Sequence, residues 1–528
     1  MRQQAGDSHA ATAASAPIAK PAERICVVIA RTRHKMMQAE IQEAAKRGGT
    51  FLELRLDYLS KAPDFKRLLA NRPCPMVATV RRLEDGGRWT GDEAQRQMLV
   101  RQAIVAGFDW VDLETDVAED IARFRKVKRI ISYHNLEETP GDLDNIYAKM
   151  CRQDADVVKI AVQAQSAGDN MRVMELLRRA KQPTVAFCLG DIGFPTRLLA
   201  AKYGAPFGYA AFNKERTISL GVPSFDDMKK IYRYPKINAH TKFYGLIGDP
   251  VAHSLGPMIH NAALAKLNIN AVYVPFRVPR GELADFLKQF DRVPIYGYSV
   301  TLPHKEAALV SAKLQDGAAT VVGAANTIIR YEEGFTAYNT DYTAARDSLL
   351  AHMEPEVDGT PALLDSKSAL VLGAGGVARA VAHALHREGA LVTVTNRTVE
   401  RAQQLAQDVG CRFVDWNARH NVNCSILVNC TSVGMHPNVD EMPVHASYLT
   451  PDLMIFDTVY TPESTMRVKE ARQRGCLVLT GVDMFVRQAE AQFKLFTDLD
   501  PPEELMADII RRVLSPVALP EEEEEPAK

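Results

Sequence analysis

The stretch KSALVLGAGGVARAVAHAL, residues 367–385, decides the fold of the second half of the chain. Its apolar start is typical of a buried strand, its centre is a glycine-rich turn, and its alanine-rich end is typical of a helix. In this context a glycine turn holds the pyrophosphate of a dinucleotide, and alanine is allowed at the third glycine position. The stretch therefore predicts a Rossmann domain, with a mere tight turn as the alternative. The predicted nucleotide-binding residues are Gly373, Ala374, Gly375, Gly376, Val377 and Ala378.

The end of the next predicted strand favours one dinucleotide over the other. Residues 395–398, TNRT, lack the acidic side chain that would accept a ribose 2′-hydroxyl. Arg397, together with Arg401, instead offers positive charge to a 2′-phosphate. We therefore predict NADP(H) and assign Asn396, Arg397, Thr398 and Arg401 to its binding, against the alternative of an exposed arginine at a helix start.

The patterns on both sides of this stretch predict two domains. The Rossmann domain, residues 348–481, continues through the strand-like runs LVTVTN, CRFVDW, SILVNC, LMIFDT and CLVLT. Residues 242–347 alternate strands and helices and end in a predicted hairpin, NTIIRYEEGFTAYN, which indicates a mixed-sheet domain. The helical patterns at about 482–514 do not connect two predicted strands, so we expect these helices to pack back on residues 242–347.

The first half of the chain, residues 22–235, reads as repeated strand-helix units. Each of eight apolar runs is followed by a helix-compatible stretch: ICVVIA, FLELRL, MVATV, DWVDLE, RIISYH, DVVKIAV, TVAFCL and FGYAAF. Eight such units predict parallel strands with right-handed crossovers, closed as a (β/α)8 barrel. An open doubly wound sheet is the alternative.

Charged side chains recur at the C-terminal ends of these strands, where a barrel carries its active site. They are Glu53, Arg55, Asp57, Arg81, Glu114, His134 and Lys159. Charges inside apolar strands are costly to bury unless they are paired or used, so we expect them to converge on one mouth. A lone strand lysine or histidine is more often a rim or ion-pair residue. A lysine surrounded by arginines, however, loses its proton more readily and can then attack a ketone to form a Schiff base.

Four ordered motifs in this half resemble type I 3-dehydroquinate dehydratase over about residues 22–233. The motifs are ELRLD (53–57), VRRLEDGG (80–87), ISYHN (131–135) and VVKIAV (157–162). The resemblance implies Lys159 as the Schiff-base nucleophile and His134 as the general base and acid. It further implies that ring hydroxyls and the carboxylate are held by Glu53, Arg55, Arg81 and Arg197.

Two positions depart from the pattern of that family. Asp85 stands where glutamate is usual beside the histidine, and residues 217–222, TISLGV, stand where S-A-P-G-Q is usual. Val222 cannot donate the hydrogen bond of the usual glutamine, and Thr217 or Ser219 is the available substitute.

Six further motifs resemble shikimate dehydrogenase over residues 242 to about 497. They are GDPVAHSLGPMIHN (248–261), GYSVTLPHKE (297–306), GAANTI (323–328), YNTDY (338–342), NCTSVGM (429–435) and GVDMFVRQA (481–489). The resemblance implies Lys305 and Asp341 as the catalytic pair, although alone they read equally as a helix-start lysine and a helix cap. The implied substrate contacts are Ser254, Thr301, Asn326, Tyr460 and Gln488. Gly256 replaces the second serine of the carboxylate clamp, which removes one donor, worth about 1 kcal/mol.

Composition excludes several other classes of protein. The 528 residues carry 64 Lys+Arg against 65 Asp+Glu, so no overall positive field attracts nucleic acid or an anionic membrane. No apolar run reaches the ~18 residues of a membrane span. Eight cysteines without a close C-x-x-C pair argue against a metal cluster or disulfide scaffold and for a cytoplasmic protein. Residues 1–21 and 519–528 are expected to be disordered tails.

We therefore predict a barrel followed by a two-domain α/β reductase, together a bifunctional enzyme acting on small molecules without a metal. The first half is expected to dehydrate 3-dehydroquinate, and the second to reduce 3-dehydroshikimate to shikimate with NADPH. One alternative is a reductase that acts on quinate, because its carboxylate clamp is altered. Another is a metabolite-sensing pseudoenzyme, against which the retained Lys159, His134, Lys305 and Asp341 argue.

Overall fold

A computed structural model of the chain describes residues 24–216, 219–252, 254–353 and 364–514. The predicted tails, 1–21 and 519–528, lie outside the described residues. No described helix is both long and apolar enough to cross a bilayer. The described residues form two compact units. One joins the described residues up to Pro257 with Ile269–Ile295, and the other joins Met258–Asn268 with the described residues from Tyr296 to Leu514.

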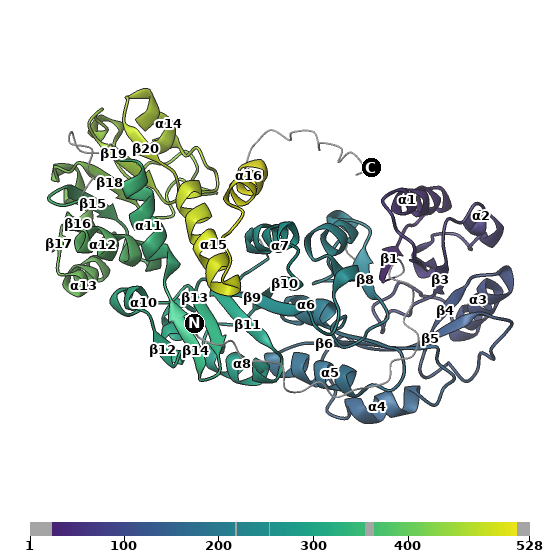
Figure 1. Ribbon diagram of the computed structural model, residues 1–528. Helices are drawn as coiled ribbons and strands as arrows, with labels where there is room; N and C mark the ends of the chain where they lie inside the picture. Colours follow the sequence, from purple (N-terminus) through teal and green to yellow (C-terminus); the bar gives the residue numbers. More distant parts are fainter. Residues whose placement is uncertain (1–23, 217–218, 253, 354–363, 515–528) are drawn as a thin grey trace. The chain divides into compact units, whose positions relative to one another are not determined.

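Eight parallel strands form one sheet in the first unit (Figure 1). They are β1 (Ile25–Ile29), β2 (Leu52–Arg55), β3 (Met76–Thr79), β4 (Trp110–Glu114), β5 (Lys128–Asn135), β6 (Val157–Gln163), β7 (Thr184–Leu189) and β8 (Gly208–Ala211). Neighbours follow the chain from β1 to β7, and β8 returns to pair with β1. An open doubly wound sheet would instead reverse its strand order, so the predicted barrel is confirmed.

The barrel is almost closed by hydrogen bonds. In the described chain, β7 and β8 stand at the two ends of the strand order and share no ladder. The rings of Phe187 on β7 and Tyr209 on β8 meet at 6.1 Å across this seam. Both rings belong to a buried apolar cluster with Val28, Val77 and Ile130, so side-chain packing completes the closure there.

Helices follow most of the barrel strands. They are α1 (His34–Lys46), α2 (Phe65–Leu69), α3 (Glu93–Ala106), α4 (Leu143–Met150), α5 (Ala167–Arg179) and α6 (Gly190–Leu199). A capping box of Ser166 and Asp169 begins α5 because each side chain accepts from backbone at the free helix end. The expectation of a helix after every strand is wrong for β4, since residues 115–127 form turns and β5 follows directly.

A strand pair and a short helix continue the first unit. β9 (Lys242–Gly248) and β10 (Ala271–Arg277) run parallel, with Lys242 opposite Ala271 and Gly248 opposite Arg277. α8 (Leu283–Gln289) follows β10. Within this unit β10 lies against α6, and α8 lies against α5.

The second unit begins with a mixed set of strands. They are β11 (Ile295–Val300), β12 (Leu314–Gln315), β13 (Thr327–Tyr331) and β14 (Gly334–Tyr338). β13 and β14 form the predicted hairpin, β11 pairs antiparallel with β13, and β12 pairs parallel with β14. The accompanying helices are α7 (Gly256–Lys266), α9 (Lys305–Ser311), α10 (Gly317–Val322) and α11 (Thr340–Ala351).

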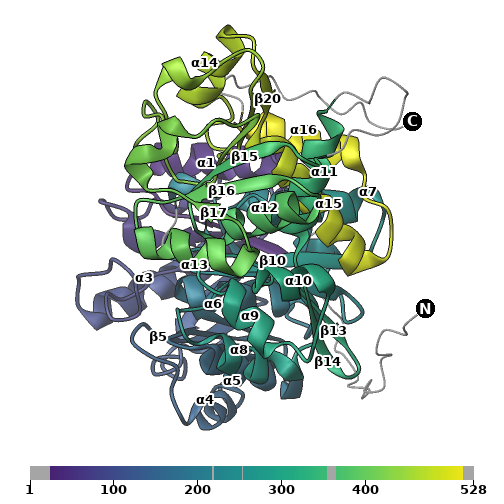
Figure 2. The ribbon, with the colours of Figure 1, turned by 90° about the vertical axis from the view of Figure 1, so that its left-hand side faces the viewer.

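A parallel six-stranded sheet of order β17-β16-β15-β18-β19-β20 follows. Its strands are β15 (Ser368–Leu372), β16 (Leu391–Thr395), β17 (Arg412–Phe413), β18 (Ile426–Asn429), β19 (Met454–Asp457) and β20 (Leu477–Leu479). α12 (Gly376–Arg387) and α13 (Val399–Val409) pack on β15, β16 and β17 (Figure 2), and α14 (Met466–Gln473) packs on β19 and β20. The strand order reverses beside β15, as in a Rossmann sheet.

The last described helices are α15 (Gly481–Thr497) and α16 (Glu503–Leu514). α15 lies along α11 and touches β13, which brings it to the strands that precede the Rossmann sheet (Figure 1). A capping box of Thr480 and Asp483 begins α15, and a stripe of buried side chains including Met484, Phe493 and Phe496 faces inward.

Candidate active sites

A cavity of about 90 Å³ opens among the C-terminal ends of the barrel strands. Eight of the polar residues named from the sequence line it: Glu53, Arg55, Arg81, Asp85, His134, Lys159, Arg197 and Ser219. Asp57 and Glu114 do not line it, contrary to the expectation that all the strand-end charges converge on the mouth. Asp57 pairs with Arg55 at 2.8 Å, and Glu114 is held by Arg81 and Arg96, each at 2.7 Å.

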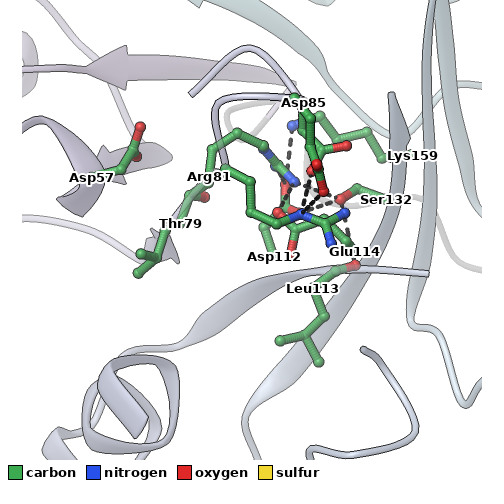
Figure 3. Close-up of polar contacts among 12 residues, drawn as sticks. Asp57, Thr79, Arg81, Asp85, Asp112, Leu113, Glu114, Ser132 and Lys159 are labelled. Atoms are coloured by element: carbon green, nitrogen blue, oxygen red, sulfur yellow. Dashed lines mark hydrogen bonds and ion pairs between the residues drawn. The ribbon is translucent and has the colours of Figure 1, made fainter. Parts of the chain in front are cut away.

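Lys159 is held by a buried carboxylate that the sequence reading missed (Figure 3). Its Nζ lies 3.0 Å from Asp112 Oδ2 and 3.8 Å from Glu53 Oε1. The Asp112 side chain has no exposed surface, and it also pairs with Arg81 at 2.7 Å and accepts a hydrogen bond from Ser132 Oγ at 2.6 Å. The nearest charges to Lys159 are therefore the carboxylates of Asp112 and Glu53, and the expected arginines Arg55 and Arg81 line the same cavity.

Burial and charge act in opposite directions on Asp112. Burial alone favours the neutral acid, but Arg81 and Lys159 together hold the pKa of the Asp112 carboxyl well below its usual range. Asp112 therefore stays ionised, and its carboxylate fixes both Arg81 and Lys159. Asp112 and Glu114 are two residues apart on β4 and so face the same side of the strand, which is the sequence signal that could have found Asp112.

His134 is held in its neutral form, which is the form of imidazole that can accept a proton. Burial, followed by the positive charges of Arg81 and Lys159, lowers the pKa of His134 well below its usual value. Within the described chain its Nδ1 is buried without a hydrogen-bond partner. Asp85 does not supply one, because its carboxylate bonds to Arg82 Nε at 2.6 Å. Asp85, whose side chain is shorter than the usual glutamate, thus pairs with Arg82 and not with His134.

Arg197 presents an unused guanidinium to the same cavity. It lies in the last turn of α6, with its guanidinium 4.2 Å from the centre of the Phe187 ring. Its Nε and Nη2 are buried and have no partner among the described residues. Burial lowers the pKa of Arg197 to about 9, so the group remains a cation at neutral pH. A buried cation with free donors is suited to a carboxylate ligand.

The loop after β8 also reaches this cavity. Ser219 and Val222 line it, whereas Thr217 lies outside the described residues. Gly221 has φ +74°, and a Cβ there would lie 2.4 Å from the carbonyl oxygen of Gly190. Glycine is therefore required at position 221, and its close approach sets the loop against the start of α6.

The second unit contains a separate pair of ionisable groups. Lys305, the first residue of α9, places its Nζ 2.6 Å from Asp341 Oδ2. Asp341 lies in the first turn of α11, which Asn339 caps by accepting from Tyr342 N. The two side chains are only 15% and 11% exposed, so their attraction is little weakened by solvent.

Asn326 is oriented beside this pair. Its Nδ2 donates to Thr340 Oγ1 at 2.9 Å, and its Oδ1 accepts from Thr340 N at 2.8 Å. Gln492 on α15 donates to Asn326 O at 3.1 Å and accepts from Ser299 Oγ at 2.8 Å. Gln492 was also missed from sequence, although it lies four residues after Gln488 and hence on the same helix face.

The remaining predicted contact residues lie on nearby elements or in the other unit. Gln488 accepts from Thr340 Oγ1 through its backbone oxygen, and Tyr460 stacks on Phe485 of α15 at 4.7 Å. Thr301 directly follows β11, whose last residue donates its N–H to Asn326 O at 2.7 Å. Ser254 belongs to the first unit, where its Oγ accepts from Gly256 N at 3.2 Å.

The glycine turn has the shape that a dinucleotide needs. Gly373 has φ +115°, and a Cβ there would lie 2.8 Å from the Cys430 carbonyl oxygen. A Cβ at Gly375 would meet nothing within 4 Å, which leaves room for a phosphate group at the N-terminus of α12. A Cβ at Gly376 would lie 3.7 Å from Lys305 Cδ, so the turn adjoins the Lys305–Asp341 pair.

Cationic side chains at the end of β16 fit a phosphorylated ribose. Arg397 and Arg401 are exposed, and neither forms an ion pair within the described chain. Asn396 uses its Nδ2 to hold Thr398 O at 3.0 Å, which shapes the loop that carries Arg397. No carboxylate of this loop opposes a phosphate, so these residues fit NADP(H).

Comparisons with known proteins agree with this pair of sites. The profile described as type I 3-dehydroquinase matches residues 25–239. Profiles described as the shikimate dehydrogenase substrate binding domain, shikimate / quinate 5-dehydrogenase and shikimate 5′-dehydrogenase C-terminal domain match residues 246–328, 359–434 and 481–511. The chain thus combines a dehydroquinase barrel with a shikimate dehydrogenase.

One relative that matches most of the chain is named for the same combination. The chain is 35% identical over 94% of its length, and 85% of the relative's, to the Arabidopsis thaliana bifunctional 3-dehydroquinate dehydratase/shikimate dehydrogenase, chloroplastic. It is 28% identical to the shikimate biosynthesis protein AroDE of Chlamydia pneumoniae, over 75% of this chain and 80% of the relative. It is 37% identical to a Methanosarcina barkeri shikimate dehydrogenase (NADP(+)), over 51% of this chain and 98% of the relative. The chain belongs to the bifunctional 3-dehydroquinate dehydratase/shikimate dehydrogenase family.

Proposed function

We propose that this chain catalyses two consecutive reactions, the dehydration of 3-dehydroquinate to 3-dehydroshikimate and the NADPH-dependent reduction of 3-dehydroshikimate to shikimate. The observation that carries the proposal is the presence in one chain of two distinct lysine sites. Lys159 and His134 line the same barrel cavity, and Lys305 is paired with Asp341 beside a dinucleotide turn.

In the barrel, Lys159 would attack the ketone carbon and lose its protons as water leaves, giving an iminium. His134 would remove a proton from the adjacent carbon while the iminium accepts the electrons. The protonated imidazole would then return that proton to the departing hydroxyl, which leaves as water. A second water molecule would hydrolyse the iminium, which breaks the bond to Lys159 and releases 3-dehydroshikimate. Arg197 would hold the carboxylate, while Glu53, Arg55 and Arg81 would hold the ring hydroxyls.

In the second unit, Lys305 would donate a proton to the carbonyl oxygen as the ketone is reduced. Asp341 would keep the ammonium in place through its 2.6 Å contact and orient the neighbouring hydroxyl. Asn326, Thr301, Tyr460 and Gln488 of the second unit would position the ring. Bound NADPH supplies the reducing equivalent, and the residues at 373–378 with Asn396, Arg397, Thr398 and Arg401 would hold it.

Feeding purified full-length protein with 3-dehydroquinate and NADPH tests both halves together. We expect NADPH to be consumed and shikimate to appear. Borohydride added during turnover should trap an adduct on Lys159, and Lys159→Ala should abolish dehydration while reduction of added 3-dehydroshikimate continues. An adduct elsewhere would refute the Schiff-base assignment, and binding without turnover would favour the metabolite-sensing alternative.

A quinate-oxidising reductase is a second candidate, and Gly256 is the observation that favours it. A Cβ at this position would lie 3.3 Å from Tyr273 Oη and 3.4 Å from Ser254 Oγ, so a second serine would fit after a small shift. The chain therefore lacks a hydrogen-bond donor at position 256, although a serine side chain would fit there. Oxidation rates with quinate and with shikimate distinguish the candidates, and Gly256→Ser should shift the ratio towards shikimate.

We also propose that the protein acts on these small molecules without a metal ion and in the cytoplasm. Within the described chain, no group of three or more histidine, cysteine, aspartate or glutamate side chains is arranged to hold a metal. The Arabidopsis relative is named as chloroplastic, so fractionation of the source cells is the direct test of location. Retention of both activities after dialysis against a chelator tests the metal prediction.

A further inference from the structure

A second cavity lies within the first unit, and none of its lining residues lines the barrel cavity. It has a volume of about 310 Å³ and is enclosed by α5 and α6 on one side and by β10, α8 and the segment between them on the other. This volume is within the ~300–1,000 Å³ range of small-molecule sites. None of the residues assigned above to either reaction lines it.

A buried amide lines this cavity with one unsatisfied end. Asn170 on α5 is 2% exposed, and its Nδ2 donates to the carbonyl oxygen of Ile192 at 2.8 Å. Its Oδ1 has no partner among the described residues. The amide cannot be reversed to remove this deficit, because its oxygen would then face a carbonyl oxygen. A buried acceptor without a donor is costly, by about 1–3 kcal/mol.

The charges around the cavity also favour a donor. Glu282 and Asp285 line it, and neither forms an ion pair within the described chain. The one cation in the lining, Arg277, is already matched by Asp249 at 2.8 Å and by Asp191 at 3.6 Å. The cavity therefore offers uncompensated acceptors and no uncompensated cation.

The rest of the lining is apolar and aromatic. Phe276 and Phe286 meet edge to face at 5.6 Å, and Val278, Pro279 and Ile192 complete this wall. An aromatic wall attracts an organic cation by cation–π interaction as well as by burial of apolar surface. The lining thus combines an apolar wall with hydrogen-bond acceptors and contains no uncompensated cation.

We propose that this cavity binds a small organic cation, with a primary ammonium group on an apolar body. The ammonium would donate to Asn170 Oδ1 and face the carboxylates of Glu282 and Asp285, and the apolar body would lie against Phe276 and Phe286. This site is independent of the two proposed reactions, since it shares no residue with either.

Calorimetric titration of the full-length protein with benzylamine, which is an ammonium ion at pH 7, tests the proposal. Benzyl alcohol has the same ring and one polar group but no charge. We expect saturable binding of benzylamine, with benzyl alcohol at least about tenfold weaker, as expected for loss of a charge-assisted hydrogen bond. Absence of saturable benzylamine binding, or equal binding of the two probes, overturns the proposal.

Variants locate the binding. Asn170→Leu keeps the size of the side chain but removes the acceptor, so benzylamine affinity should fall about tenfold. Gln182→Met is the matched control, because Gln182 also donates to a backbone oxygen, Cys151 O at 3.1 Å, and has an unpartnered Oε1, but lies outside the cavity. Dehydratase activity reports whether each variant is folded.

A second variant tests the same site without altering a buried residue. Glu282 and Asp285 are exposed, so Glu282→Gln combined with Asp285→Asn should leave the fold intact. Benzylamine affinity should fall severalfold, and its dependence on salt should weaken. Unchanged affinity in both this double variant and Asn170→Leu would place the ligand elsewhere and overturn the proposal.

Discussion

Lys159 Nζ lies 3.0 Å from Asp112 Oδ2, and the Asp112 side chain is fully buried. The same carboxylate pairs with Arg81 at 2.7 Å, so one negative charge inside the barrel fixes two cations that come from strands that are not neighbours. Arg81 follows β3 and Lys159 lies on β6, and Asp112 on β4 joins them across the barrel interior.

We expect Asp112→Asn to destabilise the barrel. The substitution preserves shape but leaves Arg81 and Lys159 buried with less compensation, which costs about 3–5 kcal/mol for a buried pair. Dehydratase activity should therefore be lost at a lower temperature, whereas reductase activity in the same sample should follow the parent. Asp144→Asn is the control, since its carboxylate is 68% exposed and its pair with Arg179 is worth no more than ~1 kcal/mol. Equal thermal inactivation in the two variants contradicts this account.

Arg397 should decide the choice of dinucleotide. A charge-assisted contact to a 2′-phosphate contributes about 1.5–3 kcal/mol, so Arg397→Ala should weaken NADPH binding by roughly tenfold to a hundredfold. NADH lacks the phosphate, and its binding should hardly change. Fluorescence titration with both dinucleotides measures the difference. Arg387→Ala, at the opposite end of α12 from the glycine turn, should leave both affinities unchanged. Equal efficiencies of NADH and NADPH in the parent would be the contrary result.

Lys305 and Asp341 should act as one unit in catalysis. Reduction of the ketone builds negative charge on its oxygen, which an ammonium stabilises more in the transition state than in the substrate. Lys305→Met should therefore lower kcat by about 10²–10⁴ with a smaller change in KM. Asp341→Asn should have a similar effect, and the double variant should lose little more than either single one.

Steady-state kinetics with 3-dehydroshikimate measure all three variants, and persisting dehydratase activity shows that the chain is folded. NADPH affinity should stay near that of the parent. A rise in KM alone in Lys305→Met would make Lys305 a binding residue without a part in the chemical step.

His260 should make the second unit sensitive to acid. Burial lowers the pKa of His260 to about 3, although a hydrogen bond with Gln492 acts in the opposite direction. The unfolded chain takes up this proton near pH ~6.5, before the native state does. The stability contributed by the neutral form is thus complete above that pH and is lost as pH falls from about 6.5 towards 3, by about 1.4 kcal/mol per pH unit.

The variant His260→Leu removes this titration and can pack against Phe493 and Phe496, the two rings next to the imidazole. The temperature of reductase inactivation should fall less between pH 7 and pH 5 in this variant than in the parent. His240→Leu, at an exposed histidine, should keep the parent's dependence. An unchanged slope in His260→Leu would show that other groups cause the acid sensitivity.

The strands could be predicted because each is a short apolar run between turn signals, and the motifs lie where those strands end. The missing helix after β4 could not be predicted, since residues 115–127 include helix-compatible side chains and yet form turns. Strand-end reasoning found Lys159 and His134. It placed Glu114 in the cavity and overlooked Asp112, because pairing inside a barrel depends on distances between strands that one sequence does not contain.

The hydrogen bond from Gln492 to Asn326 joins residues 166 positions apart. Asn326 therefore gains part of its support only after α15 has been synthesised, whereas every barrel strand precedes residue 212. On the ribosome, the barrel can fold and begin dehydration while the chain is still growing. A chain truncated between β20 and Gln492 would keep every barrel strand but lack the Gln492 support of Asn326, so 3-dehydroshikimate would build up.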